Sequence, residues 1–445
     1  MRSRVGWVTL FVALLGAGGK PVDAQQSAPQ RLTLKDAINL ALKQNLSVRV
    51  ASAQVEGSEG TRERRRASLL PHASADALGN RENIDLGAMG ISFPNVPAVV
   101  GPFNHYDFRL SASQSLIDRH SYHNWKAGEK QEEAAKLDYQ DSRDLVIRQA
   151  AGLYLEAQAS AAEMEAAGSR VTTSGVLEKL ARDQHAQGLA TAVDEVRAQV
   201  QLARDQQNLL VARNTFQTSL LVLAHFLGLS PGAPLELAEP LKFHHVESVD
   251  ANQALHTALE ARPDYAALLK QKESLVEQLK ASRARYLPTL AVNGDYGAIG
   301  RGFGSMAGTG EIQGTLTVTL FDRDRAGEKI ELQSQVKRLD AQIDDLNRQI
   351  DRELRTALLN LESTESQVTV TEAGLHLAER ELSLAQDRFR NGVTDNIEVV
   401  TAQASLASAQ DDRIMALAQH ADAVMALVRA LGGTEKIYQA YLSEP

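Results

Sequence analysis

Few side chains in this sequence are spaced for chemistry. His120 and His123 stand one helical turn apart, and His244 and His245 are adjacent. Neutral imidazoles at such spacing bind zinc when thiolates or carboxylates complete the ligand set. The chain has no Cys, and no acidic residues are spaced to complete such a set. We therefore interpret the four histidines as surface residues and predict no metal site.

Catalytic arrangements are missing from the sequence as well. We find no Ser-His-Asp arrangement, no Gly-rich phosphate loop and no paired catalytic carboxylates, so we predict no cofactor and no enzyme. The absence of Cys also excludes disulfides, a thiol nucleophile and an N-terminal lipid on cysteine.

Two carboxylates, Asp194 and Glu398, belong to a different kind of pattern. Each follows a glycine, Gly188 or Gly392, by six residues. The glycines suit the left-handed residue that ends a helix. Each acid closes a four-residue segment, Thr-Ala-Val-Asp or Asp-Asn-Ile-Glu, which resembles the capping box that begins a helix. The pattern therefore predicts two tight turns, each between two antiparallel helices.

These turns belong to an internal duplication. A Leu-Pro pair at residues 70–71 recurs at 287–288, displaced by 217 residues, whereas Gly188 recurs as Gly392, displaced by 204. The difference lies between residues 71 and 116, so the first copy carries the longer insertion. A repeat of about 200 residues is no short-period solenoid but one large unit used twice.

The N-terminus has the layout of a secretory signal peptide. Arg2 and Arg4 precede an uncharged run, and small residues lead to a cut expected after Ala24. We then divide the chain into a signal peptide (1–24), a first repeat (25–230), a Pro-rich connector (231–249), a second repeat (250–433) and a C-terminal tail (434–445).

Each repeat contains a very long helix. From Leu332 to Leu361 apolar residues recur in steps of four and three, which is typical of a coiled-coil seam. No proline stands between Arg323 and Gly433, so roughly 68 residues predict a rod on the order of 100 Å. The matching stretch 119–187 is equally free of proline. Returning helices are expected at about 191–227 and 395–431.

Four segments alternate apolar and polar residues, which predicts strands with one apolar face. They lie at about 72–86, 106–113, 289–296 and 315–320, joined by the loops Gly87–Phe103 and Gly300–Gly310. Segments of about ten residues suit a tilted strand that crosses a bilayer. Aromatic residues lie in or beside these segments, where a membrane-interface girdle needs them: Phe93, Phe103, Tyr106, Phe108, Tyr286, Tyr296, Phe303 and Phe321.

Composition and strand number limit the possible partners. A formal net charge of −9 disfavours nucleic acid, because phosphate binding needs a basic face. After the signal we find no uncharged run long enough for a membrane helix.

Four strands cannot close a barrel in lipid, so several chains must share one. Two chains give eight strands with a filled interior, whereas three give twelve and leave a lumen.

The chain resembles the TolC-type outer-membrane efflux proteins over nearly its whole mature length. The resemblance rests on a helical segment starting at Leu34, a Leu-Pro-Thr-Leu segment at Leu287, a Leu-Phe-Asp segment at Leu320, and most strongly Arg-Phe-Arg-Asn-Gly-Val-Thr-Asp-Asn-Ile-Glu from Arg388. It implies a mainly helical chain that contributes four strands to a twelve-stranded barrel of a homotrimer. It also implies a periplasmic helical tunnel below outer-membrane lipid. The tunnel would dock on an adaptor of an inner-membrane pump.

The resemblance places a gate and an adaptor contact at the hairpin tips. The matching residues are Gly188, Asp194, Phe389, Gly392, Thr394 and Glu398. In a trimer the two acids would form rings of carboxylates, which attract cations and in which the carboxylates repel each other. The alternative is that both acids only cap helices. Many family members carry an Arg where this chain has Thr394, so we do not expect a lock built on that Arg.

Two other functions fit parts of the sequence. A periplasmic coiled-coil scaffold explains the heptads but leaves the aromatic strands without a purpose. A general diffusion porin explains the strands but needs no long helices. We therefore predict a passive export duct, with the exported substrate left open.

Overall fold

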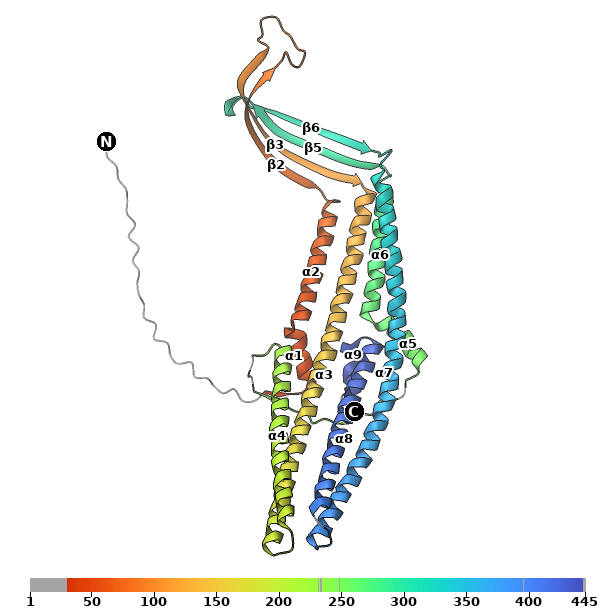
Figure 1. Ribbon diagram of the computed structural model, residues 1–445. Coiled ribbons are helices and arrows are strands. Elements are labelled where there is room, and N and C mark those ends of the chain that lie inside the picture. The colour runs from red at the N-terminus through yellow and green to blue at the C-terminus, as the bar shows by residue number, and fades with distance from the viewer. Residues whose placement is uncertain (1–29, 231, 233, 248, 395, 443–445) are drawn as a thin grey trace, which may run out of the picture.

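The computed structural model describes residues 30–442, except 231, 233, 248 and 395. The predicted signal peptide, 1–24, lies outside the described residues. A four-stranded sheet forms one end of the elongated molecule, and two helical hairpins end in tips at the other (Figure 1). Short helices and the connector surround the long helices between these ends.

The two copies have the same element order. The first contains β1 (Gln30–Leu32), α1 (Leu34–Gln44), α2 (Leu46–Ala67), β2 (His72–Asp85), β3 (Val99–Ile117), α3 (Arg119–Ala186) and α4 (Ala192–Phe226). The second contains β4 (Leu235–Leu237), α5 (Ala251–Ala261), α6 (Pro263–Ala284), β5 (Thr289–Gly300), the 3₁₀ helix η1 (Phe303–Ser305), β6 (Ala307–Thr317), α7 (Asp324–Arg390) and α8 (Asn396–Leu431), before the final α9 (Thr434–Leu442). This order confirms the mainly helical, duplicated fold. The four domain boundaries within the chain stay predictions.

Two helices precede each pair of strands. Asn45 is extended between α1 and α2, and its side chain caps α2 by accepting from Ser47 N at 2.9 Å. Arg262 is extended between α5 and α6, where Pro263 opens α6 and has no N–H to continue α5. An Asx cap and a proline therefore produce the same break in the two copies.

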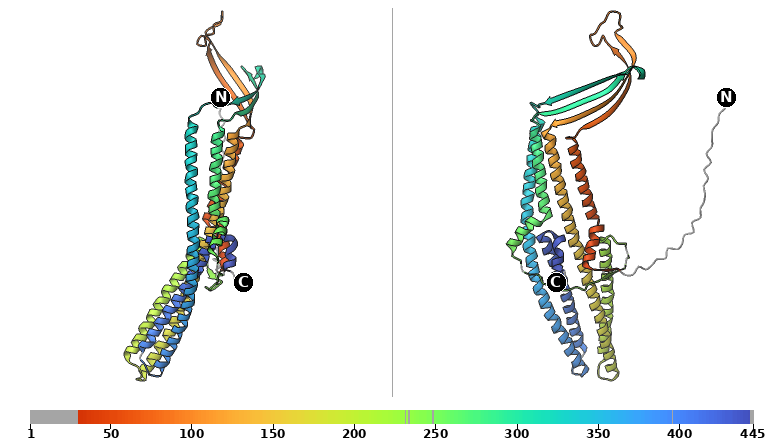
Figure 2. Two further views of the ribbon diagram at one scale, coloured as in Figure 1. Left: turned by 90° about the vertical axis from the view of Figure 1, so that its right-hand side faces the viewer. Right: turned by 180° about the vertical axis from the view of Figure 1, so that it is seen from behind.

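The long helices match the sequence prediction closely. α3 has 68 residues and α7 has 67, and the returning helices α4 and α8 begin within one residue of the expected positions. Predicted seam residues of α7 are buried, among them Leu339, Ile350 and Leu361. Further views show these helices side by side down to the tips (Figure 2).

α8 is long and apolar enough in composition to cross a membrane, but 67% of its most apolar window is buried inside the structure. Its apolar residues, including Met425 and Val428, pack with Tyr154 of α3 and Leu223 of α4 in the largest core cluster. The composition of α8 therefore reflects its central place among helices.

The sheet is antiparallel, with strand order β2-β3-β5-β6. The pairing places Ala75, Leu110, Tyr296 and Gly310 in one row, so the apolar residues of all four strands share one face. That face comprises Ala73, Ala75, Ala77, Tyr106, Phe108, Leu110, Leu290, Val292, Tyr296, Ile312 and Leu316. The opposite face is polar, and Arg109 pairs there with Asp107 and Asp295. In the described chain the outer edges of β2 and β6 have no partner strand.

Three strands differ from their predicted ranges. β3 begins at Val99, inside the predicted loop Gly87–Phe103, β5 continues to Gly300, and β6 covers 307–317 instead of 315–320. The glycines of β6 weaken the alternation that marks a strand. Tyr296 of β5 lies beside two of these glycines: a Cβ at Gly308 would meet its hydroxyl, and a Cβ at Gly310 would meet its ring, each about 3 Å away. The partner of β6 in the sheet, which its own sequence does not show, is therefore β5.

The connector crosses the middle of the molecule and joins the copies. β4 pairs in parallel with β1, and the residues that follow pass α3, α8 and α7. A buried ion network lies at the same level: Arg262, 2% exposed, binds Asp264 and Glu353 at 2.6 and 2.7 Å. Arg429 of α8 binds Asp141 of α3 at 2.6 Å. Breaking such buried pairs on one side costs several kcal/mol, so they fix the helices in register.

Candidate functional site at the hairpin tips

The first tip joins α3 to α4. Gly188 has a φ of 75°, and its N–H donates to the carbonyl of His185 at 2.9 Å. Thr191 then caps α4. Its hydroxyl accepts from the N–H of Asp194, and the Asp194 carboxylate accepts in return from Thr191 N at 3.1 Å. The predicted capping box is confirmed.

The second tip joins α7 to α8 with the same backbone turn. Gly392 has a φ of 68°, and its N–H donates to the carbonyl of Phe389 at 3.0 Å. Thr394 is half-buried in the turn that follows. The predicted cap, Asp395, lies outside the described residues, so the second capping box stays a prediction.

The two tips are packed against each other. The Asn396 amide of α8 donates to the carbonyl of Asp194 at 3.0 Å, and the Gln184 amide of α3 donates to the carbonyl of Phe389 at 3.4 Å. Phe389 itself is 3% exposed and lies in an apolar cluster drawn from all four hairpin helices. The cluster contains Leu177, Ala181, Ala198, Leu382, Ala385, Phe389, Val399 and Ala402. Phe389 therefore joins the hairpins to each other.

The two acids of the tips differ in their surroundings. Asp194 is 6% exposed; burial raises the pKa of its carboxyl, but hydrogen bonds from Thr191 outweigh this, and the pKa lies below its ordinary value. Glu398 is half-buried and pairs with Arg388 across its own hairpin at 2.9 Å. Arg388 thus makes an inter-helix pair within the second hairpin. The cap function of Asp194 is confirmed, whereas a gating role for either acid stays a prediction.

A buried polar contact between the hairpins was not predicted. The Ser174 hydroxyl of α3 donates to the Asp205 carboxylate of α4, and both residues are almost fully buried. The Gln403 amide of α8 donates to Ser174 Oγ at 3.3 Å. The sequence signals this contact only by placing polar residues at positions where the helix seams are otherwise apolar. It does not show which residues pair, because the partners of Ser174 lie 31 and 229 residues away along the chain.

Several large apolar side chains near the tips are exposed. They are Leu189, Val193, Val196 and Val200 on the first hairpin and Val393 and Ile397 on the second. Val193, Val196 and Val200 of α4 line a groove of about 430 Å³ together with Val400 of α8, and Arg197 and Arg204 also contribute to it. Contiguous exposed apolar surface with a charged rim is typical of a protein contact site.

The histidines lie in two different places. His120 and His123 are half-buried between α3 and α6, so their prediction as surface residues is wrong; His123 Nδ1 lies 2.8 Å from Glu277 Oε2. His245 is exposed, as predicted, and lies 2.6 Å from Glu365. Among the described residues no group of three or more His, Cys, Asp or Glu side chains is arranged for a metal ion.

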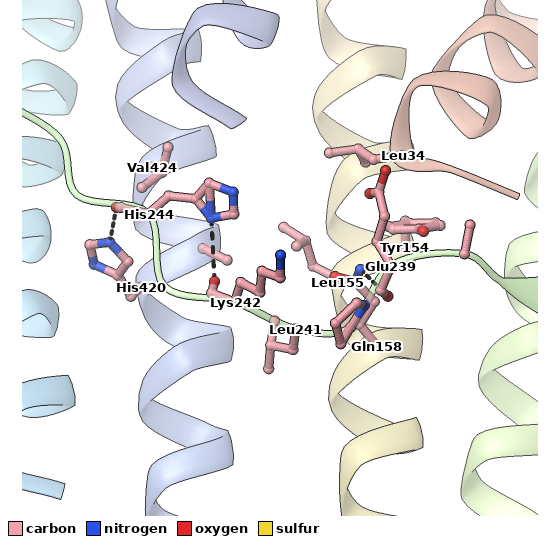
Figure 3. A pocket seen from close by; sticks show the side chains of 13 residues that line it. Leu34, Tyr154, Leu155, Gln158, Glu239, Leu241, Lys242, His244, His420 and Val424 are labelled. Carbon is pink, nitrogen blue, oxygen red and sulfur yellow. Dashed lines mark hydrogen bonds between the residues drawn. The ribbon is translucent and has the colours of Figure 1, made fainter. Parts of the chain in front are cut away.

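A cavity of about 410 Å³ lies beneath the connector, between α3 and α8 (Figure 3). The Gln158 amide donates to the carbonyl of Glu239 at 2.8 Å, and His420 Nε2 lies 2.8 Å from the carbonyl of His244. Burial raises the pKa of Tyr154 to about 12, so its hydroxyl stays protonated and donates to the carbonyl of Leu32. These groups hold the connector against the helices.

Comparison with known proteins shows the family of the chain and its fold. The model of the family described as outer membrane efflux protein matches the chain twice, over residues 37–229 and 254–433. The chain belongs to this family. Its location is therefore the outer membrane, as the sequence predicted.

Curated relatives cover most of the chain at low identity. The chain is 23% identical over 420 residues to the probable efflux pump outer membrane protein TtgC of Pseudomonas putida, covering 90% of this chain and 83% of that protein. It is 24% identical over 409 residues to protein CyaE of Bordetella pertussis, covering 90% and 84%. The fold also matches the outer membrane protein VceC of Vibrio cholerae, with a TM-score of 0.78 at 19% identity over 90% of this chain and 96% of that one. The outer membrane channel CmeC of Campylobacter jejuni gives 0.79 at 17% identity, covering 90% and 86%.

Proposed function

We propose that the chain is one subunit of a homotrimeric outer-membrane channel that exports solutes delivered by an inner-membrane pump. The observation that carries this proposal is a sheet with one apolar face and two unpaired edges, placed on two long helical hairpins. Relatives named as efflux pump outer membrane proteins support it. The channel would be passive: the pump supplies the energy, and this chain catalyses no reaction.

Closure of the barrel requires other copies. An open edge in lipid leaves backbone N–H and C=O groups unsatisfied, at several kcal/mol for each group. Pairing β6 of one copy with β2 of the next removes both edges by symmetry. A barrel shared by two copies would have eight strands and an interior filled by side chains, whereas a barrel shared by three copies would have twelve strands and a lumen. The apolar face then meets outer-membrane lipid, and the face with Arg109 and Asp295 lines the pore.

The tips would carry the gate and the adaptor contact. The proposal assigns these roles to Gly188, Asp194, Phe389, Gly392, Thr394 and Glu398. The exposed apolar groove between the hairpins supports a protein partner at this end of the molecule, since side chains such as Val193 and Val196 have no cover. The tight backbone turns and the Phe389 cluster give that partner a rigid surface.

Conductance across a planar lipid bilayer tests the proposal. The purified full-length protein should migrate as a heat-resistant trimer extracted only with detergent, and it should open stable conductance steps. A periplasmic scaffold gives none. A monomer recovered without detergent, together with no conductance, would contradict the channel.

Removal of both tip acids tests the gate. We expect Asp194→Ala combined with Glu398→Ala to increase entry of large antibiotics into cells and to raise closed-state conductance. Glu379→Ala combined with Asp412→Ala removes two exposed acids from α7 and α8 away from the tip and serves as the matched control. Unchanged permeability at normal trimer levels would leave Asp194 as a helix cap and Glu398 as a surface ion-pair partner.

A further inference from the structure

Basic residues are concentrated where helices join strands. Four short segments make these junctions: residues 61–71, 114–122, 281–289 and 318–328. Together they contain nine arginines and five acidic residues, although the whole chain has a net charge of −9. We call this group the arginine collar: Arg62, Arg64, Arg65, Arg66, Arg119, Arg283, Arg285, Arg323 and Arg325.

The collar occupies one level of the molecule. The ends of α2, α3, α6 and α7 lie side by side directly next to the sheet (Figure 1). Contacts between neighbouring helices fix this level. Arg65 Nη1 donates to the carbonyl of Asn124 at 3.3 Å, and Arg285 pairs with Glu328 at 3.4 Å. Between them, His120 Nδ1 lies 3.0 Å from the carbonyl of Ala281.

Five collar arginines have partners inside the protein. Arg62, Arg66, Arg285 and Arg325 pair with carboxylates, and Arg65 donates to a carbonyl. The other four are exposed, and in the described chain no carboxylate lies within ion-pair distance of them. They are Arg64, Arg119, Arg283 and Arg323, one on each of the four helices. Each junction thus presents one exposed guanidinium that has no carboxylate partner in the described chain.

Two of these four arginines stand at positions where their positive charge does not stabilise the helix that they begin. Arg119 is the first residue of α3 and Arg323 is the N-cap of α7, and the positive end of the helix dipole disfavours a cation there. The hydrogen bonds at these helix starts come from the preceding acids: Asp118 accepts from Ser121 N, and Asp322 accepts from Asp324 N. Arg119 and Arg323 occupy equivalent positions in the two copies. Their charge is therefore not explained by the helices that they begin.

The surface beside the collar is apolar and aromatic. Next to the strand ends Tyr286, Leu287, Leu320 and Phe321 are all exposed. A band of aromatic and apolar side chains with arginines on one side is typical of a membrane–water interface. Guanidinium groups form paired hydrogen bonds with phosphate oxygens. Both observations point to phosphate held at the membrane surface.

We propose that Arg64, Arg119, Arg283 and Arg323 bind the phosphates of anionic phospholipids in the leaflet that meets the helical part of the molecule. This rests on the proposed function, in which the apolar face of the sheet meets lipid. A basic residue at an anionic surface gains about 1 kcal/mol, so each arginine should strengthen retention of an anionic lipid about fivefold.

Lipid retention by the purified full-length protein tests the collar. Wild type in detergent is incubated with phosphatidylglycerol or with phosphatidylcholine, and bound lipid is counted by native mass spectrometry. We expect wild type to prefer phosphatidylglycerol and each single Arg→Gln variant to lose about fivefold of that preference. The quadruple variant should show none, whereas four Arg→Lys changes should keep most of it.

A matched variant changes four exposed arginines far from the junctions to glutamine: Arg213, Arg348, Arg352 and Arg380. It should retain lipid like wild type; an equal loss in this control, or no loss in the collar variant, would overturn the proposal. If the quadruple variant does not fold, wild type in about 1 M NaCl replaces it, since screening should abolish the preference. A preference that survives salt, or that inorganic phosphate at the lipid concentration abolishes, also overturns it.

Planar-bilayer conductance of the same samples separates this proposal from the channel. Intact conductance without a lipid preference in wild type overturns the collar alone. A lipid preference that depends on the four arginines, in a protein without conductance, overturns the channel and supports the collar.

Discussion

The two hairpin tips derive from one duplicated unit, yet they are held in different ways. Both turn on a left-handed glycine, Gly188 or Gly392. The residue three positions before the glycine differs between the tips: it is His185 in the first tip and the buried Phe389 in the second. The burial of the acids shows the opposite pattern: Asp194 of the first tip is buried, whereas Glu398 of the second is partly exposed.

This difference shows that the duplication preserved backbone turns and changed what fastens them. The second hairpin inserts an aromatic side chain into the cluster shared by all four helices. The first hairpin contributes smaller apolar side chains to that cluster. It also contributes the Gln184 amide, which donates to the carbonyl of Phe389, and the carbonyl of Asp194, which accepts from Asn396. Opening a gate at this end would therefore require the tips to break the apolar contact of Phe389 and a few hydrogen bonds. The contribution of each of these interactions to tip stability can be measured by substitution.

Phe389→Ala should have the largest effect on the tips. Truncation of a buried phenylalanine costs about 3–5 kcal/mol, and Phe389 is 3% exposed among residues of both hairpins. Hydrogen exchange of peptides from the tips should show this loss of local stability in both hairpins. His185→Ala at the matching position is the control and should cost less than about 1 kcal/mol, because its ion pair with Glu195 is partly exposed and the change removes no large apolar side chain from a core. Equal effects would contradict the asymmetry.

Gly188→Ala and Gly392→Ala should have smaller and nearly equal effects. Both glycines have a φ near 70°, and a Cβ at either position would meet no atom within 4 Å. Only the backbone preference of L-residues opposes the change, at about 1–2 kcal/mol. Exchange rates of the two turns in the two variants measure this cost. Costs that differ by more than about 1 kcal/mol would show that the turns are not equivalent.

Local rules predicted the parts of the tips that depend on neighbouring residues. Gly188 and Gly392 marked helix ends, and Thr191 with Asp194 marked a helix start, because each of these interactions joins residues within one turn. The lengths of α3 and α7 followed from a proline-free seam. Strand faces followed from alternation, since a single row of side chains decides which side is apolar.

The parts that were missed depend on partners far along the chain. β6 pairs along its whole length with β5, and Tyr296 of β5 lies beside its glycines, neither of which the composition of β6 alone reveals. The burial of Asp194 depends on Asn396, and that of Ser174 on Gln403, each more than 200 residues away. His123 is half-buried because Glu277 lies on a helix of the other copy.

Asp194→Ala should cost about 1 kcal/mol in the first tip, the usual loss for a helix cap. The pKa of folded Asp194 lies below that of an unfolded aspartate, about 3.9. The contribution of the carboxylate is therefore complete above about pH 4 and is lost as the pH falls through the lower, folded value. Tip stability measured from pH 7 to pH 3 should fall in wild type and stay flatter in Asp194→Ala. A parallel fall in both would assign the pH dependence to other groups.

Glu398→Ala should have the smallest effect on stability. The pair with Arg388 is partly exposed, at 54% for the arginine and 36% for the glutamate, and solvent-exposed pairs contribute about 0.2–1 kcal/mol. Salt screens exposed charges, so the difference between wild type and Glu398→Ala should vanish near 1 M NaCl. A double-mutant cycle with Arg388→Ala measures the coupling by hydrogen exchange at the second tip. If the cost of Glu398→Ala persists at high salt and exceeds that of Asp194→Ala, the exposed acid, and not the buried cap, is the main fastening of its tip.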